Sequence, residues 1–253
     1  MLSTNKRLSQ AASAALVGLL FAGTAIAAPL VVRSAGPSAK AYPAGKALPD
    51  NAKIVLKAGD SIVLLDGRGT RTLSGPGTFA ASGASTVAAA SASSTLGALV
   101  SGGGERRARI GAVRSASGID KNAGKNPNVW YVDVTRSTNM CIADPSSVTL
   151  WRPSADQAAT VKVTKADGTS ADVSLAPGQA AVLWPSALPV TDGSQFKLSW
   201  DGASAPTNLK FVVVKPNSPG LEDMAQSLIK AGCNAQLDLL IQTTSLPSGG
   251  AAG

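Results

Sequence analysis

The sequence contains no histidine, and among its 253 residues only Glu105 and Glu222 are glutamates. Without histidine, neither a Ser-His-Asp triad nor a Cys-His pair can form, and most zinc sites are excluded. The only cysteines, Cys141 and Cys233, are expected to pair with each other, which leaves no thiolate nucleophile. These scarcities favour a protein that is not an enzyme and that uses no cofactor or metal.

Few histidine-free catalytic arrangements remain. Beyond residue 27 a Ser-x-x-Lys pair occurs twice, as Ser194–Lys197 and Ser227–Lys230, but neither copy is accompanied by the S-D-N and K-T-G elements of penicillin-binding enzymes. A glycosidase needs two facing acids, and Asp133 and Asp144 are the pair that could be proposed. The alternative to a binding protein is therefore a carboxylate-dependent enzyme acting on envelope glycan.

The first residues have the pattern of a secretory signal peptide. Lys6 and Arg7 precede an apolar run from 11 to 22, and Ala25-Ile26-Ala27 has the A-x-A form that signal peptidase prefers. We therefore assign residues 1–27 to a signal peptide, with an uncleaved membrane anchor as the alternative. No later segment is apolar enough to cross a bilayer, so the mature chain is expected to be periplasmic or secreted and without a transmembrane span.

If the chain is exported, its two cysteines and its net charge can be interpreted for an oxidising, extracytoplasmic compartment. In an oxidising compartment, Cys141 and Cys233 are expected to form one disulfide. The net charge is +8, and about +6 after loss of the signal peptide. Such a balance suggests an anionic envelope polymer or an envelope protein as partner, with ordinary solubility as the other reading. Nucleic acid is a poor partner for an exported chain with so few aromatic residues.

The remaining chain is patterned mainly as β-strands. Asp-Gly pairs at 66–67, 167–168, 192–193 and 201–202 are typical of tight turns that need positive φ angles. Residues 53–75 and 159–185 each predict strand, turn, strand, turn, strand, and 139–143, 194–200 and 208–214 predict further strands. Strands without intervening helices favour antiparallel sheets, here a small β domain and an Ig-like antiparallel β-sandwich.

Composition divides the chain further. Residues 80–126 are mostly Ala, Ser and Gly and are assigned to a linker, within which 108–113 could add a strand to either sheet. The domains are then a β domain at 28–79, a sandwich at 127–217, a helical pair at 218–244 and a disordered tail at 245–253. Ser218 and Asn234 are the expected caps of the two helices, and Gly232 is expected to end the first.

The glycine-rich stretch at 64–77, "LLDGRGTRTLSGPG", could cradle a phosphate or turn a hairpin. The third glycine of a G-x-G-x-x-G fingerprint is missing and both flanks predict strands, so a hairpin is favoured. Arg68 and Arg71 on it could still form a small anion contact. Of the four tryptophans, Trp151 and Trp184 stand at apparent strand ends and are the better candidates for an exposed binding surface.

Residues 41–79, "AYPAGKALPDNAKIVLKAGDSIVLLDGRGTRTLSGPGTF", resemble the FecR-type periplasmic domain. The resemblance implies a small β-rich module that relays envelope signals or mediates contacts between envelope proteins, with no catalytic residues. The C-terminal part is similar to uncharacterised exported proteins of Gram-negative bacteria, which implies no activity. The sequence thus predicts an exported, non-catalytic binding or envelope-interaction protein with a FecR-like module.

Overall fold

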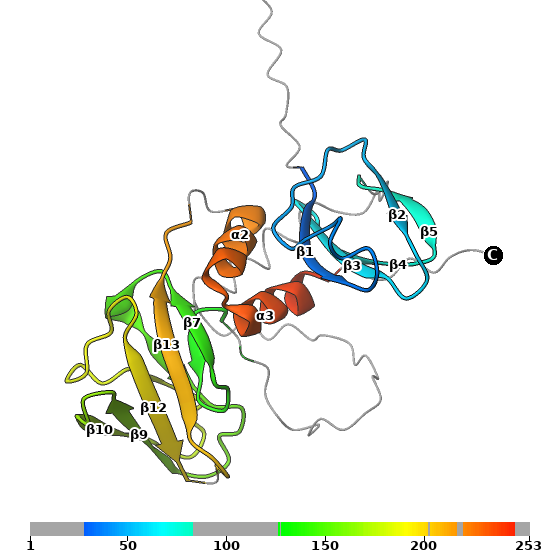
Figure 1. Ribbon diagram of the computed structural model, residues 1–253. Helices are drawn as coiled ribbons and strands as arrows, with labels where there is room; N and C mark the ends of the chain where they lie inside the picture. Colours follow the sequence, from blue (N-terminus) through cyan, green and yellow to red (C-terminus); the bar gives the residue numbers. More distant parts are fainter. Residues whose placement is uncertain (1–27, 83–125, 127, 202, 217–219, 246–253) are drawn as a thin grey trace, which may run out of the picture.

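The computed structural model describes residues 28–82, 126, 128–201, 203–216 and 220–245 (Figure 1). The assigned signal peptide, the segment 108–113 and nearly all of the assigned linker lie outside these residues. The described chain is mainly β with two C-terminal helices, which confirms the predicted fold class. In that part of the chain, no helix is both long and apolar enough to cross a membrane.

The N-terminal module, residues 28–82, is built from two small sheets. One sheet has the order β1-β3-β4 and the other pairs β2 with β5, all antiparallel. The strands are β1 (Leu30–Ala35), β2 (Lys53–Leu56), β3 (Ser61–Asp66), β4 (Gly69–Ser74) and β5 (Gly77–Ala80). The predicted strands within 53–75 are present, but β2 leaves its sequence neighbour β3 and pairs with β5.

The glycine-rich stretch turns the β3–β4 hairpin. Asp66 pairs with Gly69, so Gly67 and Arg68 form a two-residue loop. The positive φ angle, +139°, is at Gly69 and not at Gly67 of the Asp-Gly pair. At two other Asp-Gly pairs the glycine has the expected positive φ, +90° at Gly168 and +75° at Gly193.

The sandwich, residues 126–216, stacks a five-stranded sheet of order β10-β9-β12-β13-β7 on a three-stranded sheet of order β11-β8-β6. Its strands are β6 (Tyr131–Asp133), β7 (Thr138–Ile142), β8 (Thr149–Trp151), β9 (Ala159–Lys165), β10 (Ser170–Leu175), β11 (Ala181–Leu183), β12 (Gln195–Trp200) and β13 (Thr207–Val213). The sheets are not wholly antiparallel as expected, because β7 joins β13 and β6 joins β8 in parallel.

Strand alternation builds the sandwich core. Val161 and Val163 of β9 are buried, while Thr160 and Lys162 between them are exposed. Three rings meet edge to face in the centre, with centroids 4.9 Å apart for Trp184 and Phe196 and 5.2 Å apart for Trp184 and Phe211. Such edge-to-face pairs add to the stabilisation that burial of the rings already gives.

The helices are α2 (Leu221–Ala231) and α3 (Asn234–Thr244), and neither has the N-cap that the sequence predicted. Gly220 is the N-cap of α2, and the predicted cap Ser218 lies outside the described residues. The N-cap of α3 is Cys233, and the predicted cap Asn234 is the first residue of the helix. The end of α2 is as predicted, because Gly232 has a left-handed φ of +69°. A glycine adopts this conformation without the steric cost that a side chain would add.

The two helices form a shared layer that contacts both β modules (Figure 1). Leu228 and Leu237 of the helices belong to one buried cluster with Leu30 of β1, Leu65 of β3 and Cys141 of β7. The predicted disulfide tied the helical pair to the strand that contains Cys141, and the contact with the N-terminal module was not predicted. Ser245, assigned to the disordered tail, instead continues this layer and forms a parallel β-bridge with Thr70.

Candidate functional site

The two tryptophans chosen as surface candidates are buried. Trp151 lies in β8 and pairs with Ala181 of β11, and Trp184 is 9% exposed in the aromatic centre of the core. Its indole Nε1 donates a hydrogen bond of 2.7 Å to the carbonyl of Leu188. The prediction of an exposed tryptophan surface is wrong, because the strand ends that looked exposed in sequence are covered by their own loops.

The shallow groove beside Trp184 offers a different surface. It has a volume of about 490 Å³ and an apolar, proline-rich lining. The groove is lined by Pro145, Ser146, Val148, Leu183, Trp184, Pro185, Ser186, Pro189 and Val190. Leu183 on β11 is 70% exposed and contributes an apolar side chain to this lining.

Arg68 and Arg71 are engaged inside their own module. Arg68 contacts Asp66 at 3.0 Å across the hairpin loop. Arg71 donates to the carbonyls of Ala80 (2.8 Å) and Ala81, which ties β4 to the end of β5. Burial lowers the pKa of the Arg71 guanidinium. Both arginines therefore stabilise their own module, Arg68 at the hairpin loop and Arg71 between β4 and β5. The geometry gives no support to an anion contact at Arg71.

Asp133 and Asp144, the acids of the enzymatic alternative, each accept hydrogen bonds from their own turn. Asp133 accepts from the N–H and hydroxyl of Thr135. Asp144 accepts from the N–H and hydroxyl of Ser146, and these bonds lower the pKa of its carboxyl. A general acid needs a raised pKa, so Asp144 suits a turn cap better than acid catalysis. In the described residues, no three His, Cys, Asp or Glu side chains gather as a metal site.

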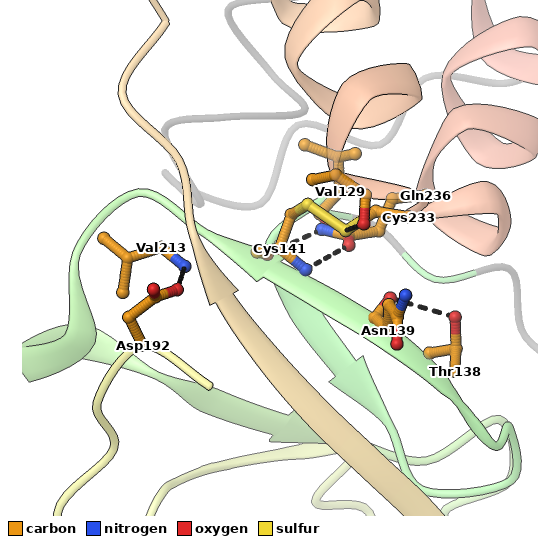
Figure 2. The surroundings of a disulfide bond; sticks show 9 residues. Val129, Thr138, Asn139, Cys141, Asp192, Val213, Cys233 and Gln236 are labelled. Carbon is orange, nitrogen blue, oxygen red and sulfur yellow. Dashed lines mark hydrogen bonds between the residues drawn. A yellow bond between two sulfur atoms is a disulfide. The ribbon is translucent and has the colours of Figure 1, made fainter. Parts of the chain in front are cut away.

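The predicted disulfide between Cys141 and Cys233 is present and joins β7 to the corner between α2 and α3 (Figure 2). Beside it the buried side-chain amide of Gln236 forms hydrogen bonds with the backbone of β7, as a neighbouring strand would. Its amide oxygen accepts from the N–H of Cys141 at 2.7 Å, and its amide nitrogen donates to the carbonyls of Cys141 and Val129 at 2.8 Å. The corner is thus fixed to β7 by one covalent bond and two hydrogen bonds, and a third hydrogen bond ties it to the turn at Val129.

A polar cleft of about 620 Å³ opens next to this corner. Its walls are the start of β7 and the first turn of α3, and Gly232 lies between them. The lining residues are Arg136, Ser137, Thr138, Asn139, Gly232, Asn234, Ala235 and Asp238. Hydroxyl and carboxamide groups dominate this lining, and such groups bind the hydroxyls of polar ligands.

Arg33 of β1 connects the N-terminal module to α3 beside the polar cleft. Its guanidinium binds Asp238 at 2.5 Å and Asn234 Oδ1 at 3.1 Å, both of which also line the cleft. The negative charge of Asp238 is therefore matched from the N-terminal module. This pair also links the first β-strand to the last helix across 205 residues.

The N-terminal module carries a basic face, which we define as Lys46, Lys53 and Lys57 together with Tyr42 and Val55. Lys53, Val55 and Lys57 alternate outward along and just beyond β2, and Val55 is 58% exposed. The Tyr42 hydroxyl accepts a hydrogen bond from the Val55 N–H at 3.0 Å. Lys46 Nζ lies 5.6 Å from the centre of the Tyr42 ring. Val55 thus lies between Lys53 and Lys57 along the strand and beside Tyr42, whose ring Lys46 contacts.

The loop after β2 is held by the buried carboxylate of Asp60. Its two oxygens accept from the N–H of Ser38 at 2.8 Å and of Lys57 at 2.5 Å. Burial opposes ionisation, but the hydrogen bonds from Ser38 and Lys57 outweigh it and lower the pKa of this carboxyl. Asp60 therefore fixes the position from which Lys57 projects.

Sequence reasoning missed the basic face and the polar cleft. The basic face did have a sequence signal. The alternation in "KIVLK", 53–57, indicates that Lys53, Val55 and Lys57 share one side of a strand. The cleft had no comparable signal, because its walls are about 95 residues apart in sequence. The chain matches no protein-family model, and a search of curated proteins finds no relative at a significant level.

Proposed function

We propose that the protein is an exported, periplasmic binding protein that does no catalysis and attaches to an anionic envelope surface through a FecR-like N-terminal module. The resemblance of residues 41–79 to FecR-type domains supports a role in envelope contacts. The disulfide supports an oxidising compartment, because such bonds persist mainly outside the cytoplasm.

The observation that carries the proposal is the basic face. Residues 28–82 hold seven lysines and arginines against three aspartates, a net charge of +4, while residues 126–216 have a net charge of zero. Asp60 and Asp66 are bound within the module by backbone and arginine donors. Asp50 is the only exposed acid among residues 28–82, so the lysines of the basic face outnumber their exposed counter-charges and attract an anionic partner.

Val55 and Tyr42 favour a lipid surface over a soluble polyanion as this partner. An exposed apolar side chain among lysines can enter the boundary between headgroups and acyl chains while the ammonium groups contact phosphates. Each lysine near an anionic membrane contributes about 1 kcal/mol to binding. The face thus combines the charge and the apolar contact that a peripheral membrane protein needs.

Local bonding of the carboxylates supports a binding role over the enzymatic alternative. Asp144 and Asp167 accept hydrogen bonds from Ser146 and Thr169 in their own turns, and these bonds lower the pKa of both carboxyls. Lowered pKa values keep the groups ionised as turn caps near neutral pH. They are unsuited to donating a proton to a glycosidic oxygen.

The test is partitioning of the mature chain onto vesicles of phosphatidylglycerol with phosphatidylethanolamine, followed by sedimentation. We expect binding that weakens with salt, and roughly thirtyfold weaker binding when Lys53→Gln and Lys57→Gln are combined, from about 1 kcal/mol per lysine. The matched control combines Lys197→Gln with Lys210→Gln, which removes the same charge from the sandwich and is expected to leave vesicle binding unchanged.

Equal binding of both double variants would overturn the role of the basic face. Vesicles of phosphatidylethanolamine and phosphatidylcholine alone should bind weakly, and strong binding to them would contradict an anionic partner. Turnover of envelope glycan that disappears in Asp133→Asn would instead establish the carboxylate-dependent enzyme.

A further inference from the structure

The outer face of the five-stranded sheet carries a row of lysines that the basic face does not include. Lys162 on β9, Lys197 on β12 and Lys210 on β13 all point away from the core, as their exposure between buried neighbours shows. We name these three residues the lysine row. The sandwich as a whole is neutral, and on this side of the sheet the three lysines outnumber one acid, Asp172 of β10.

Strand register places the lysine row on one straight diagonal. Lys197 pairs with Thr164 on β9 and with Asn208 on β13, while Lys162 pairs with Ser199 and Lys210 with Gln195. Each lysine is therefore two residues from the direct partner of the next one. Diagonal neighbours in a sheet lie about 7–8 Å apart, so the row spans about 15 Å.

The row leads into the polar cleft. Lys210 pairs with Asn139 of β7, and Asn139 lines the cleft together with Thr138 and Arg136. Figure 2 shows Thr138 and Asn139 on the same strand as Cys141, which the disulfide joins to the helical corner. Row and cleft therefore form one continuous polar track from β9 to α3.

The opposite end of the track is marked by an acid. Asp172 of β10 pairs directly with Lys162, so a negative side chain stands just beyond the last lysine. A polyanion on the row would meet attraction from the cleft to Lys162 and repulsion at Asp172. This asymmetry gives the track a defined end.

Side chains around the row favour a glycan over nucleic acid. The outward positions beside the lysines are hydroxyl and carboxamide residues, namely Thr160, Thr164, Ser199, Gln195, Asn208 and Asn139. These groups hydrogen-bond sugar hydroxyls, whereas single-stranded nucleic acid is held by aromatic rings stacked on bases. The register also spaces the three lysines evenly, which suits an extended chain with regularly spaced charges.

We propose that the lysine row and the polar cleft bind one linear polysaccharide that carries carboxylate or phosphate groups. The ammonium groups of Lys162, Lys197 and Lys210 contact its anionic groups, and Asn139 and Asn234 contact its hydroxyls in the cleft. This site is separate from the basic face, so the protein holds a surface with one module and a glycan with the other.

The experiment titrates the mature, disulfide-bonded chain with oligogalacturonate and with a maltooligosaccharide of the same length, at low and at physiological salt. We expect binding of the charged chain only, weakening with salt. The triple variant Lys162→Gln, Lys197→Gln, Lys210→Gln should bind about tenfold more weakly or worse, since ionic contacts dominate binding of a polyanion. The matched control is Lys40→Gln, Lys53→Gln, Lys57→Gln, which should bind like the wild type.

Two single variants test the ends of the track. Asp172→Asn should strengthen binding several-fold by removing the repulsive end, and Asn139→Asp should weaken it by placing an acid beside Lys210. All substitutions are at exposed positions, and an unchanged thermal transition confirms folding.

The inference is overturned if the lysine triple variant and the control lose equal affinity, or if the uncharged oligosaccharide binds as well. It is also overturned if the triple variant loses vesicle binding and keeps glycan binding. Because vesicles report on the basic face and oligogalacturonate on the lysine row, the failure of either proposal is visible without the other.

Discussion

The N-terminal module and the sandwich bury their apolar side chains in different ways. The sandwich closes its core between its own two sheets around three aromatic rings. The N-terminal module has an aliphatic core on one side of its β1-β3-β4 sheet, formed by residues such as Val31, Ile62 and Leu64. On the other side Leu30, Val32 and Leu65 pack against the helical layer.

Because of this difference, the N-terminal module depends on the helical layer to cover part of its apolar surface. Successive residues of β1 point to opposite faces, so Val31 enters the module's own core while Leu30 and Val32 enter the shared one. Loss of the helical layer would expose apolar surface on β1 and β3, whereas the interior of the sandwich would keep its partners. The helices thus act as the second layer that a small sheet requires.

The largest expected effect comes from removing the disulfide with Cys141→Ser and Cys233→Ser together. The bond closes a loop of 92 residues, for which the chain-entropy model gives about 4–5 kcal/mol. Because the bond fixes the helical corner, amide exchange should accelerate more in β1 and β3 than in β9 and β12. Equal acceleration in all four strands would contradict the dependence of the N-terminal module on the helices.

Gln236→Ala is expected to have the next largest effect. The change leaves the Cys141 N–H and the carbonyls of Cys141 and Val129 without their partner. Each buried unsatisfied group costs about 1–3 kcal/mol, so three groups at the low end of that range give an expected total loss of about 3–4 kcal/mol in denaturant unfolding. Gln242→Ala, an exposed position on the same helix, is the control and should change stability by less than about 0.5 kcal/mol.

Asp60→Asn should destabilise the N-terminal module by less than Gln236→Ala does. Asparagine keeps one acceptor oxygen but presents an NH₂ group to one of the two N–H donors. The folded-state pKa of Asp60 is lowered, so its contribution is present at neutral pH and is lost as pH falls below about 4 toward that lowered pKa. Thermal melts between pH 7 and pH 3 should therefore show a smaller acid loss in the variant, and parallel curves would refute this.

The smallest effect is expected for Asp238→Asn, which removes the ion pair with Arg33. Both side chains are partly exposed, and exposed ion pairs contribute about 0–1 kcal/mol. Calorimetry should find a change within this range, since apolar packing rather than charge joins β1 to α3. A loss well above 1 kcal/mol would show that the two modules are held together mainly by this pair.

Local sequence patterns predicted most strands, because alternation and turn residues act over a few positions. The register and partners of these strands did not follow from the same signals. β2 pairs with β5 rather than with its hairpin neighbour, and β7 inserts beside β13 in parallel across about 70 residues. Such choices depend on which faces can be buried together, and a single strand does not contain that information.

Candidate site residues were predicted less well than the fold. Trp151 and Trp184 were expected at the surface because prolines and arginine follow them, yet neighbouring loops bury both. Arg152 is itself buried and donates to the carbonyls of Gln157, Ala176 and Gln179, which closes those loops over the core. Burial of an arginine by backbone carbonyls is invisible in sequence, because its acceptors come from other loops.

The sequence by itself determined the mainly β class, the turns, the two helices and the pairing of two lone cysteines, since each depends on local propensity or on simple exclusion. Tertiary structure alone decided that the helices would serve both modules, that three distant lysines would share one diagonal, and that a polar cleft would open beside the disulfide. The reason is physical: side chains far apart in the chain become neighbours only when strand register and packed faces are fixed together.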